Sequence, residues 1–163
     1  MWPFSRPRSP DDRLLRHARA FMRRGQWDKA AEVFERLLAE HPDRTEARVN
    51  YGAVLYHLGR YGEALEQFEQ ALAADPSLGQ AWLNLAACAN QLGLMNKARE
   101  ALERAAAADP KMRDLHYNLA ILHLKEGRPS QAMAELEAEL ALHPSNAAAR
   151  ALSAALESTL FRP

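Results

Sequence analysis

Three columns of residues recur along the chain at a spacing of 34 positions. The first column holds glycine, the second alanine and the third proline: Gly25, Gly59, Gly93 and Gly127; Ala30, Ala64, Ala98 and Ala132; Pro42, Pro76, Pro110 and Pro144. A constant period of this length is typical of arrays in which each repeat is one supersecondary unit. The chain is therefore predicted to contain four similar units in tandem.

The residues within each unit predict two helices. Glycine tolerates the left-handed backbone that ends a helix, and proline cannot continue one. Between these signals, apolar side chains recur at i, i+4, i+7 and i+8, which places them on one helical face. The first unit shows this stripe as Ala30, Phe34, Leu37 and Leu38. We therefore expect an all-α fold built from antiparallel helix hairpins.

The first helix of each unit carries a small residue at the same register, where two helices can approach closely: Ala18, Gly52, Ala86 and Ala120. The segment Trp82-Leu83-Asn84-Leu85-Ala86, followed by Gly93, Ala98 and Asp109-Pro110, strongly resembles the tetratricopeptide repeat (TPR). The resemblance covers four units, 11–44, 45–78, 79–112 and 113–146. It implies a right-handed superhelical array of four antiparallel helix hairpins with a concave side. His17, His123 and Glu139 depart from the family pattern, as residues of terminal repeats often do.

The segments outside the repeats receive separate predictions. Residues 147–160 carry a single apolar stripe of leucines and are expected to form a C-terminal capping helix, with Ser145 or Asn146 as its N-cap. Residues 1–10 contain three prolines and no apolar core of a secretory signal, so they are expected to be a flexible N-terminal tail. Residues 161–163 are expected to be a short C-terminal tail.

The composition limits the class of protein. Cys88 is the only cysteine, so no internal disulfide can form, and a reducing cytoplasm is the expected location. No apolar run reaches the roughly 18 residues of a membrane span. Seven arginines and two aspartates lie in residues 1–24, although the chain as a whole has 21 basic and 21 acidic residues. The acidic remainder disfavours nucleic acid as a partner.

The family resemblance implies the function. In TPR proteins the first helices line the concave groove, so the resemblance implies a protein-protein interaction adaptor or scaffold that binds an extended peptide segment there. No catalytic constellation is found, and no cofactor or metal is predicted, because His116 and His123 lack further ligands nearby in the sequence. Cys88 lies among alanines and is expected to be a buried, inert thiol. The protein is therefore not expected to be an enzyme.

The candidate peptide-binding residues lie on the face of the first helices opposite the packing stripe. Asn50, Asn84 and Asn118 are 34 positions apart and are predicted to hold peptide backbone, because a carboxamide has both donors and an acceptor. The alternative is that these amides only solvate their own helices. Three arginines are predicted to clamp an acidic segment, unless they form a solvated face: Arg16, Arg19 and Arg23.

Apolar and further polar residues complete the candidate site. The apolar anchors are expected to be Tyr56, Leu83, Tyr117, Ile121 and Leu124, with the alternative that Tyr117 and Leu83 pack on adjoining helices. Asn90 and Lys125 lie on the same face.

A second function stays open at this point. The protein is alternatively a self-associating structural assembly unit that uses its N-terminal tail or its terminal repeats. Trp2 and Phe4 would then insert into the groove of the same or a neighbouring copy, or dock on a partner or a membrane. A homo-oligomer is therefore left open, and the partner's identity and pathway are not predicted.

Overall fold

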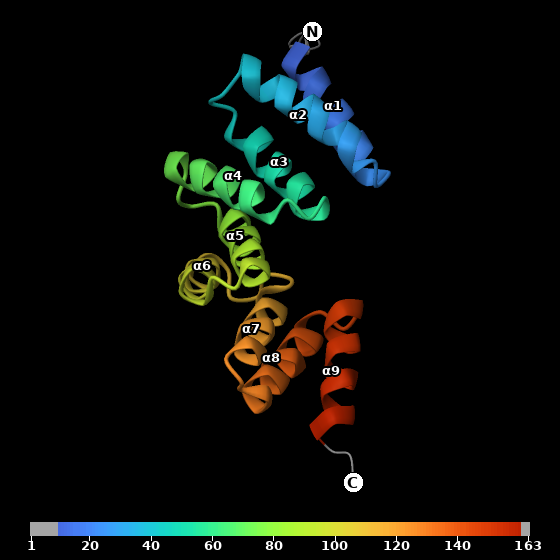
Figure 1. The fold of residues 1–163 in the computed structure, drawn as a ribbon, viewed down its shortest axis with the longest axis vertical. Coiled ribbons are helices and arrows are strands. Elements are labelled where there is room, and N and C mark those ends of the chain that lie inside the picture. Colours follow the sequence, from blue (N-terminus) through green and yellow to red (C-terminus); the bar gives the residue numbers. More distant parts are fainter. Residues whose placement is uncertain (1–9, 161–163) are drawn as a thin grey trace, which may run out of the picture. The chain divides into compact units, whose positions relative to one another are not determined.

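The structure, a computed structural model, describes residues 10–160 and is helical throughout that range, with no strand in it (Figure 1). The helices are α1 (Pro10–Arg23), α2 (Trp27–Glu40), α3 (Thr45–His57), α4 (Tyr61–Ala74), α5 (Gly79–Leu92), α6 (Met95–Ala108), α7 (Leu115–Lys125), α8 (Pro129–Leu142) and α9 (Ala147–Leu160). The predicted all-α class is confirmed. The predictions for tail residues 1–9 and 161–163 lie outside the described residues, whereas Pro10 begins α1.

The helices belong to two compact units. Unit 1 ends at Asp75 and contains α1–α4, and unit 2 begins at Pro76 and contains α5–α9. In each unit consecutive helices pair as hairpins, α1 with α2 and α3 with α4, then α5 with α6 and α7 with α8. The hairpins of a unit pack through α2 on α3 and through α6 on α7, and α9 packs on α8. The predicted helix hairpins are therefore confirmed.

The glycine and proline columns lie at the helix ends that the sequence predicted. Gly93 follows α5 with a φ of 72°, a left-handed conformation that costs other residues energy, and its N–H bonds to the Asn90 carbonyl at 3.3 Å. The other hairpin glycines share this positive φ. Each proline of the third column lies two residues beyond the end of α2, α4, α6 or α8. The chain therefore turns at the positions that the glycine and proline columns predict.

The core of each hairpin lies between the two helices. Second-helix side chains at one register are at most 1% exposed, namely Phe34, Phe68, Leu102 and Leu136. The small first-helix residues make room for them, because a Cβ added to Gly52 would lie 2.8 Å from the Phe68 ring. The small residue of the first helix and the large residue of the second helix therefore pack against each other.

The C-terminal helix closes the core of the last hairpin. Ala149 of α9 joins a buried cluster with Ala120, Ala132 and Leu136, and Leu152 and Leu156 pack against that cluster. The Asn146 side-chain oxygen accepts a hydrogen bond from the Ala149 N–H at 3.2 Å, so Asn146 caps α9. The apolar stripe predicted for this helix therefore faces α8, except that the side chain of Leu160 is not described.

Glu139 explains one departure from the family pattern. Its side chain is 0% exposed, and its Oε1 accepts hydrogen bonds from the Asp114 N–H at 3.0 Å and from Asn146 Nδ2 at 2.8 Å. Asn146 Nδ2 also donates to Asp114 Oδ1 at 2.7 Å. A carboxylate at this register therefore joins the starts of α7 and α9 through α8.

Within the helices described, none combines the length and apolarity that crossing a bilayer requires.

Candidate binding surface on the first helices

The first helices of unit 2, α5 and α7, lie side by side and are joined by polar contacts. Asn90 Nδ2 donates to the Asn118 carbonyl at 3.1 Å, and Lys125 Nζ donates to the Asn90 carbonyl. Asn90 is only 1% exposed, so its carboxamide links two helices and does not face solvent. Lys125 is exposed, although its ammonium group is engaged in this link.

The asparagines of the predicted row are engaged with their own helices. Asn50 Nδ2 donates to the Glu46 carbonyl at 2.9 Å, and Asn118 Nδ2 makes the same bond to the Asp114 carbonyl, also at 2.9 Å. Asn84 differs, because its Oδ1 accepts a hydrogen bond from Gln80 Nε2 at 3.0 Å. Asn50 belongs to unit 1 and the other two to unit 2, so a continuous row stays a prediction.

A stripe of amides on α5 was not selected from the sequence as a group. Gln80, Asn84 and Gln91 lie at i, i+4 and i+11, which places them on one face with Ala87 between them. All are exposed or half-buried, and α5 contains no charged residue in its 14 positions. We call Gln80, Asn84 and Gln91 the α5 amide stripe. The signal that could have found it is the absence of charge in a helix that presents a polar face.

The apolar candidates lie in different environments. Leu83 is 2% exposed and belongs to the core. Tyr117 is half-buried and packs against the cluster beneath α9, whereas Ile121 is half-buried one turn further along α7. In unit 1, Tyr56 makes edge contacts with the rings of His57 and Tyr61, at centroid distances of 6.0 and 5.2 Å.

The three candidate arginines of α1 have different surroundings. Arg16 is exposed and its Nε donates to the Asp12 carbonyl at 3.2 Å. Arg19 forms an ion pair with Glu46 of α3. Arg23 is exposed in the last turn of α1. Because Arg19 already has a carboxylate partner within unit 1, the acidic-segment clamp stays a prediction.

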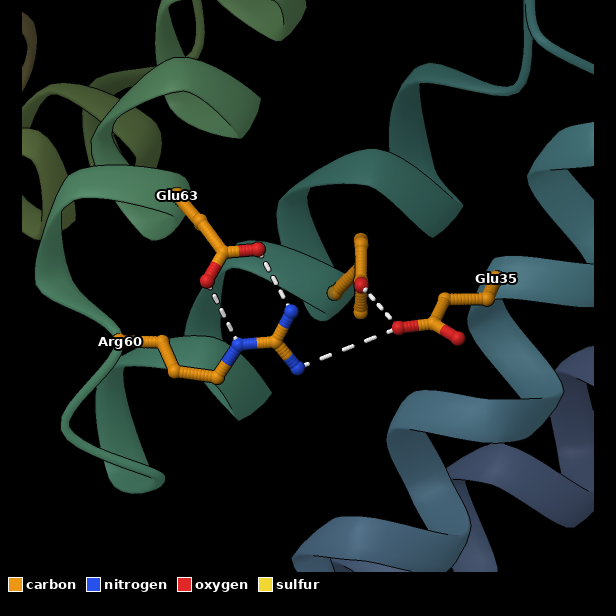
Figure 2. A network of polar contacts seen from close by, with 4 residues as sticks. Glu35, Arg60 and Glu63 are labelled. Atoms are coloured by element: carbon orange, nitrogen blue, oxygen red, sulfur yellow. Dashed lines mark hydrogen bonds and ion pairs between the residues drawn. The ribbon is translucent and has the colours of Figure 1, made fainter.

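A polar network in unit 1 ties α2 to α3 and to the turn before α4 (Figure 2). Tyr51 donates its hydroxyl hydrogen to Glu35 at 2.6 Å, and burial together with this bond raises the pKa of Tyr51. Arg60 binds Glu63 through two parallel bonds of 2.7 and 2.5 Å, which lowers the pKa of Glu63, and lies 4.0 Å from Glu35. The network fixes the hairpins of unit 1 together and leaves no reactive group poised for chemistry.

The other side chains that could react or bind a metal are buried or lie apart from one another. Cys88 is 0% exposed, and burial raises the pKa of its thiol to about 12, which disfavours the reactive thiolate. Across residues whose side chains are described, no three His, Cys, Asp or Glu residues gather as a metal site would require.

Comparison with known proteins assigns the repeat pattern. Two family models, both described as tetratricopeptide repeat, match the chain, one over residues 15–78 and the other over residues 55–111 and 95–156. No curated protein matches the sequence.

Solved structures share the fold along most of the chain. TTC0263, a thermophilic TPR protein in Thermus thermophilus, has a TM-score of 0.81 and 24% identity, covering 93% of this chain and 84% of that one. A crystal structure of MamA has a TM-score of 0.72 and 18% identity, with 93% and 85% covered. YrrB, described as a TPR protein with an unusual peptide-binding site, has a TM-score of 0.75 and 16% identity, with 89% and 75% covered. Identities this low show the fold alone.

Proposed function

The chain belongs to the tetratricopeptide repeat family, and from this premise we propose that it is a protein-interaction scaffold whose first helices hold an extended segment of a partner protein. The proposal is supported by the family, whose members typically act as non-catalytic scaffolds, and by the resemblance in fold to YrrB, whose description names a peptide-binding site.

The α5 amide stripe is the observation that carries this proposal. Peptide backbone is uncharged and offers alternating N–H donors and carbonyl acceptors, and carboxamides provide partners for both. A charged surface would instead suffer a desolvation cost when a neutral backbone covered it. An uncharged helix with three amides on one face therefore suits backbone recognition that does not depend on the partner's side chains.

The contacts of the asparagines refine their proposed role. In Asn50 and Asn118 the amide nitrogen is held by the carbonyl four residues earlier. The side-chain oxygen of such an asparagine keeps acceptor capacity, so we assign Asn50 to an N–H group of a segment bound on unit 1. Asn118 is only 8% exposed, so we place it behind the contact surface of unit 2. Asn84 accepts from Gln80, which leaves its amide hydrogens for peptide carbonyls.

The remaining candidates divide by burial. Ile121 is half-buried and is proposed to contact an apolar side chain of the partner. Leu83 and Asn90 are at most 2% exposed, so we place them behind the contact surface. Their role is to hold α5 and α7 at a constant separation, which preorganises the surface.

Site-specific photocrosslinking in the native cell tests the proposal. A benzophenone amino acid is placed at position 84 or 91 of the α5 amide stripe, and at position 103 of α6 as the control, because Glu103 is exposed on the second helix of the same hairpin. We expect protein adducts at 84 and 91, mapped by mass spectrometry to one partner segment, and none of that segment at 103. Adducts that are equal at all three positions would exclude the first-helix surface.

Alanine substitutions then test the chemistry of the captured segment. The double variant Gln80→Ala/Asn84→Ala should weaken binding of a synthetic copy of the segment by about thirtyfold, since two neutral hydrogen bonds contribute about 1 kcal/mol each. Helicity and melting temperature should change little, because Gln80 is exposed and Asn84 is half-buried. Unchanged affinity would remove the amides from the mechanism.

A further inference from the structure

Residues at three repeat positions of α1 differ in exposure from the residues at the same positions of α3 and α7. These two are the first helices that pack on a preceding hairpin within their unit. Arg13, His17 and Ala20 of α1 occupy the register of Ala47, Tyr51 and Val54 in α3, and of Leu115, Leu119 and Leu122 in α7. In α3 and α7 this column faces the protein interior, since Ala47, Val54, Leu115 and Leu122 are at most 1% exposed. In α1, Arg13 and His17 are exposed.

The column on α3 shows what such a face normally contacts. Tyr51 is the equivalent of His17. Its ring centroid lies 6.3 Å from the ring centroid of Phe34, and its hydroxyl donates a hydrogen bond to Glu35. Both contacted residues belong to α2, the second helix of the preceding hairpin. The column is therefore shaped to receive a helix, and among the described residues none precedes α1 to occupy it.

The chemistry of this column on α1 is cationic. Arg13 and His17 lie at i and i+4 on one stripe of α1, Arg24 lies in the turn directly after the helix ends at Arg23, and all three are exposed. Asp12 lies on a different face and forms an ion pair with Arg44 at 3.6 Å, so it is engaged away from the stripe. The two arginines favour carboxylate partners, because the guanidinium group binds a carboxylate through two parallel bonds.

A membrane surface fits this helix less well. No apolar side chain described on α1 is fully exposed, because Leu15 is 7% and Ala18 0% exposed and the others are half-buried. They cannot insert below lipid headgroups while the hairpin is folded, and the exposed stripe offers only charge.

We propose that Arg13, His17 and Arg24 form a docking face for an acidic helix of a partner protein. From Arg13 to the end of α1 at Arg23 the helix rises about 15 Å at 1.5 Å per residue, and Arg24 follows directly. This length matches about three turns of a partner helix with glutamates at i, i+4, i+7 and i+11. The face lies on α1 in unit 1, whereas the α5 amide stripe lies in unit 2, so either surface can fail its test without the other.

The probe is a fluorescein-labelled alanine-rich peptide of about 16 residues, long enough to be partly helical in water, with glutamates at i, i+4, i+7 and i+11. Its binding to the full chain is measured by fluorescence anisotropy at low and at high salt. The double variant Arg13→Glu/Arg24→Glu should weaken binding about tenfold or more through lost charge-assisted bonds and new repulsion. Lys111→Glu/Arg113→Glu makes the same change of charge at exposed positions of unit 2 and should have less than about a twofold effect at high salt.

Several outcomes would overturn the proposal. If the probe does not bind the unaltered chain, or if both double variants lose the same affinity for it, the face is only a solvated helix end. A larger loss in Arg16→Glu/Arg23→Glu than in Arg13→Glu/Arg24→Glu would move acidic recognition to the predicted clamp. Equal binding of a proline-interrupted version of the probe would exclude a helical partner. Sedimentation of the chain with phosphatidylglycerol vesicles, abolished by Arg13→Glu/Arg24→Glu, without binding of the probe, would replace the partner protein with a membrane.

Discussion

Buried polar side chains hold specific parts of this protein together, and Glu139 is the deepest of them. Its carboxylate joins the backbone before α7 to the cap of α9, and its Oε2 has no hydrogen-bond partner. A buried carboxylate is costly to desolvate, so its contacts have to compensate. Removing the side chain leaves the Asp114 N–H and the Asn146 amide without their acceptor.

We predict that Glu139→Ala lowers the free energy of unfolding by about 2–4 kcal/mol through these lost contacts and the cavity that remains. Chemical denaturation followed by circular dichroism measures the effect. Glu137→Ala is the matched control, since Glu137 is exposed on the same helix and its loss should cost less than about 0.5 kcal/mol. Similar values for the two variants would mean that the buried network contributes no net stability.

His57 should make part of the stability depend on pH. Its ring stacks on Trp27 with centroids 4.0 Å apart, and burial lowers its pKa below the usual value. The unfolded chain therefore binds a proton on this residue more readily, so the stability linked to His57 is complete above about pH 6.5 and declines as the pH falls below that value. The decline stops once the pH lies below the folded-state pKa.

The variant His57→Phe keeps a stacked ring without a titrating group. We predict that the unaltered chain loses stability relative to this variant between about pH 7 and pH 5. Urea unfolding at several pH values, followed by tryptophan fluorescence, gives the difference and cancels the contributions of the other histidines. Parallel stability curves would show that the stack does not perturb His57.

At the scale of the helix, packing overrides intrinsic propensity. Gly52 lies inside α3 although glycine disfavours helix, because the Phe68 ring occupies the place where a Cβ would lie. Gly62 lies in the first turn of α4 with open space around its missing Cβ. An alanine substitution can therefore be compared at a crowded position, Gly52, and at an open one, Gly62.

We predict that Gly52→Ala destabilises the protein by about 1–3 kcal/mol, since overpacking outweighs the gain in helix propensity. Gly62→Ala should instead stabilise it by up to about 1 kcal/mol through the loss of glycine's conformational freedom. Thermal melting of the two variants beside the unaltered chain decides the sign. Stabilisation by both would show that the Phe68 ring moves away at little cost.

At the scale of the whole molecule, each helix contacts its sequence neighbours within its own unit. The contacts of unit 1 run through α1–α4, and those of unit 2 through α5–α9. Stability in such arrays is approximately a sum of repeat and nearest-neighbour contributions. Damage in the last hairpin should therefore remain largely local. The predicted self-association and the cytoplasmic location also belong to this scale and stay predictions.

Leu136→Ala tests this locality. Leu136 is 0% exposed in the cluster beneath α9, and its truncation should cost about 2–5 kcal/mol. Hydrogen exchange followed by mass spectrometry should show that amides of α7–α9 lose protection while those of α1–α4 change little. A uniform loss along the chain would mean that the array unfolds as one cooperative block.

How far the sequence predicts this protein can be judged from particular residues. Gly93 and Pro110 predict the ends of α5 and α6 because backbone freedom and a missing N–H act locally, whatever the rest of the chain does. The 34-residue spacing then predicts all four hairpins, and the apolar stripes predict which helical faces pack together. These properties depend on residues close in sequence, so the sequence alone determined the hairpins.

The candidate surface depended on the tertiary structure. Helical periodicity assigned Leu83, Asn90 and Asn118 to the exposed face, yet all three are buried, and Asn90 bonds to the Asn118 carbonyl where α5 meets α7. Arg19 lies against Glu46, a partner on another helix that no local pattern predicts. Periodicity gives the direction of a side chain from its own helix, whereas exposure depends on neighbouring helices. Which side chains remain at the surface for a partner was therefore decided by how the hairpins pack.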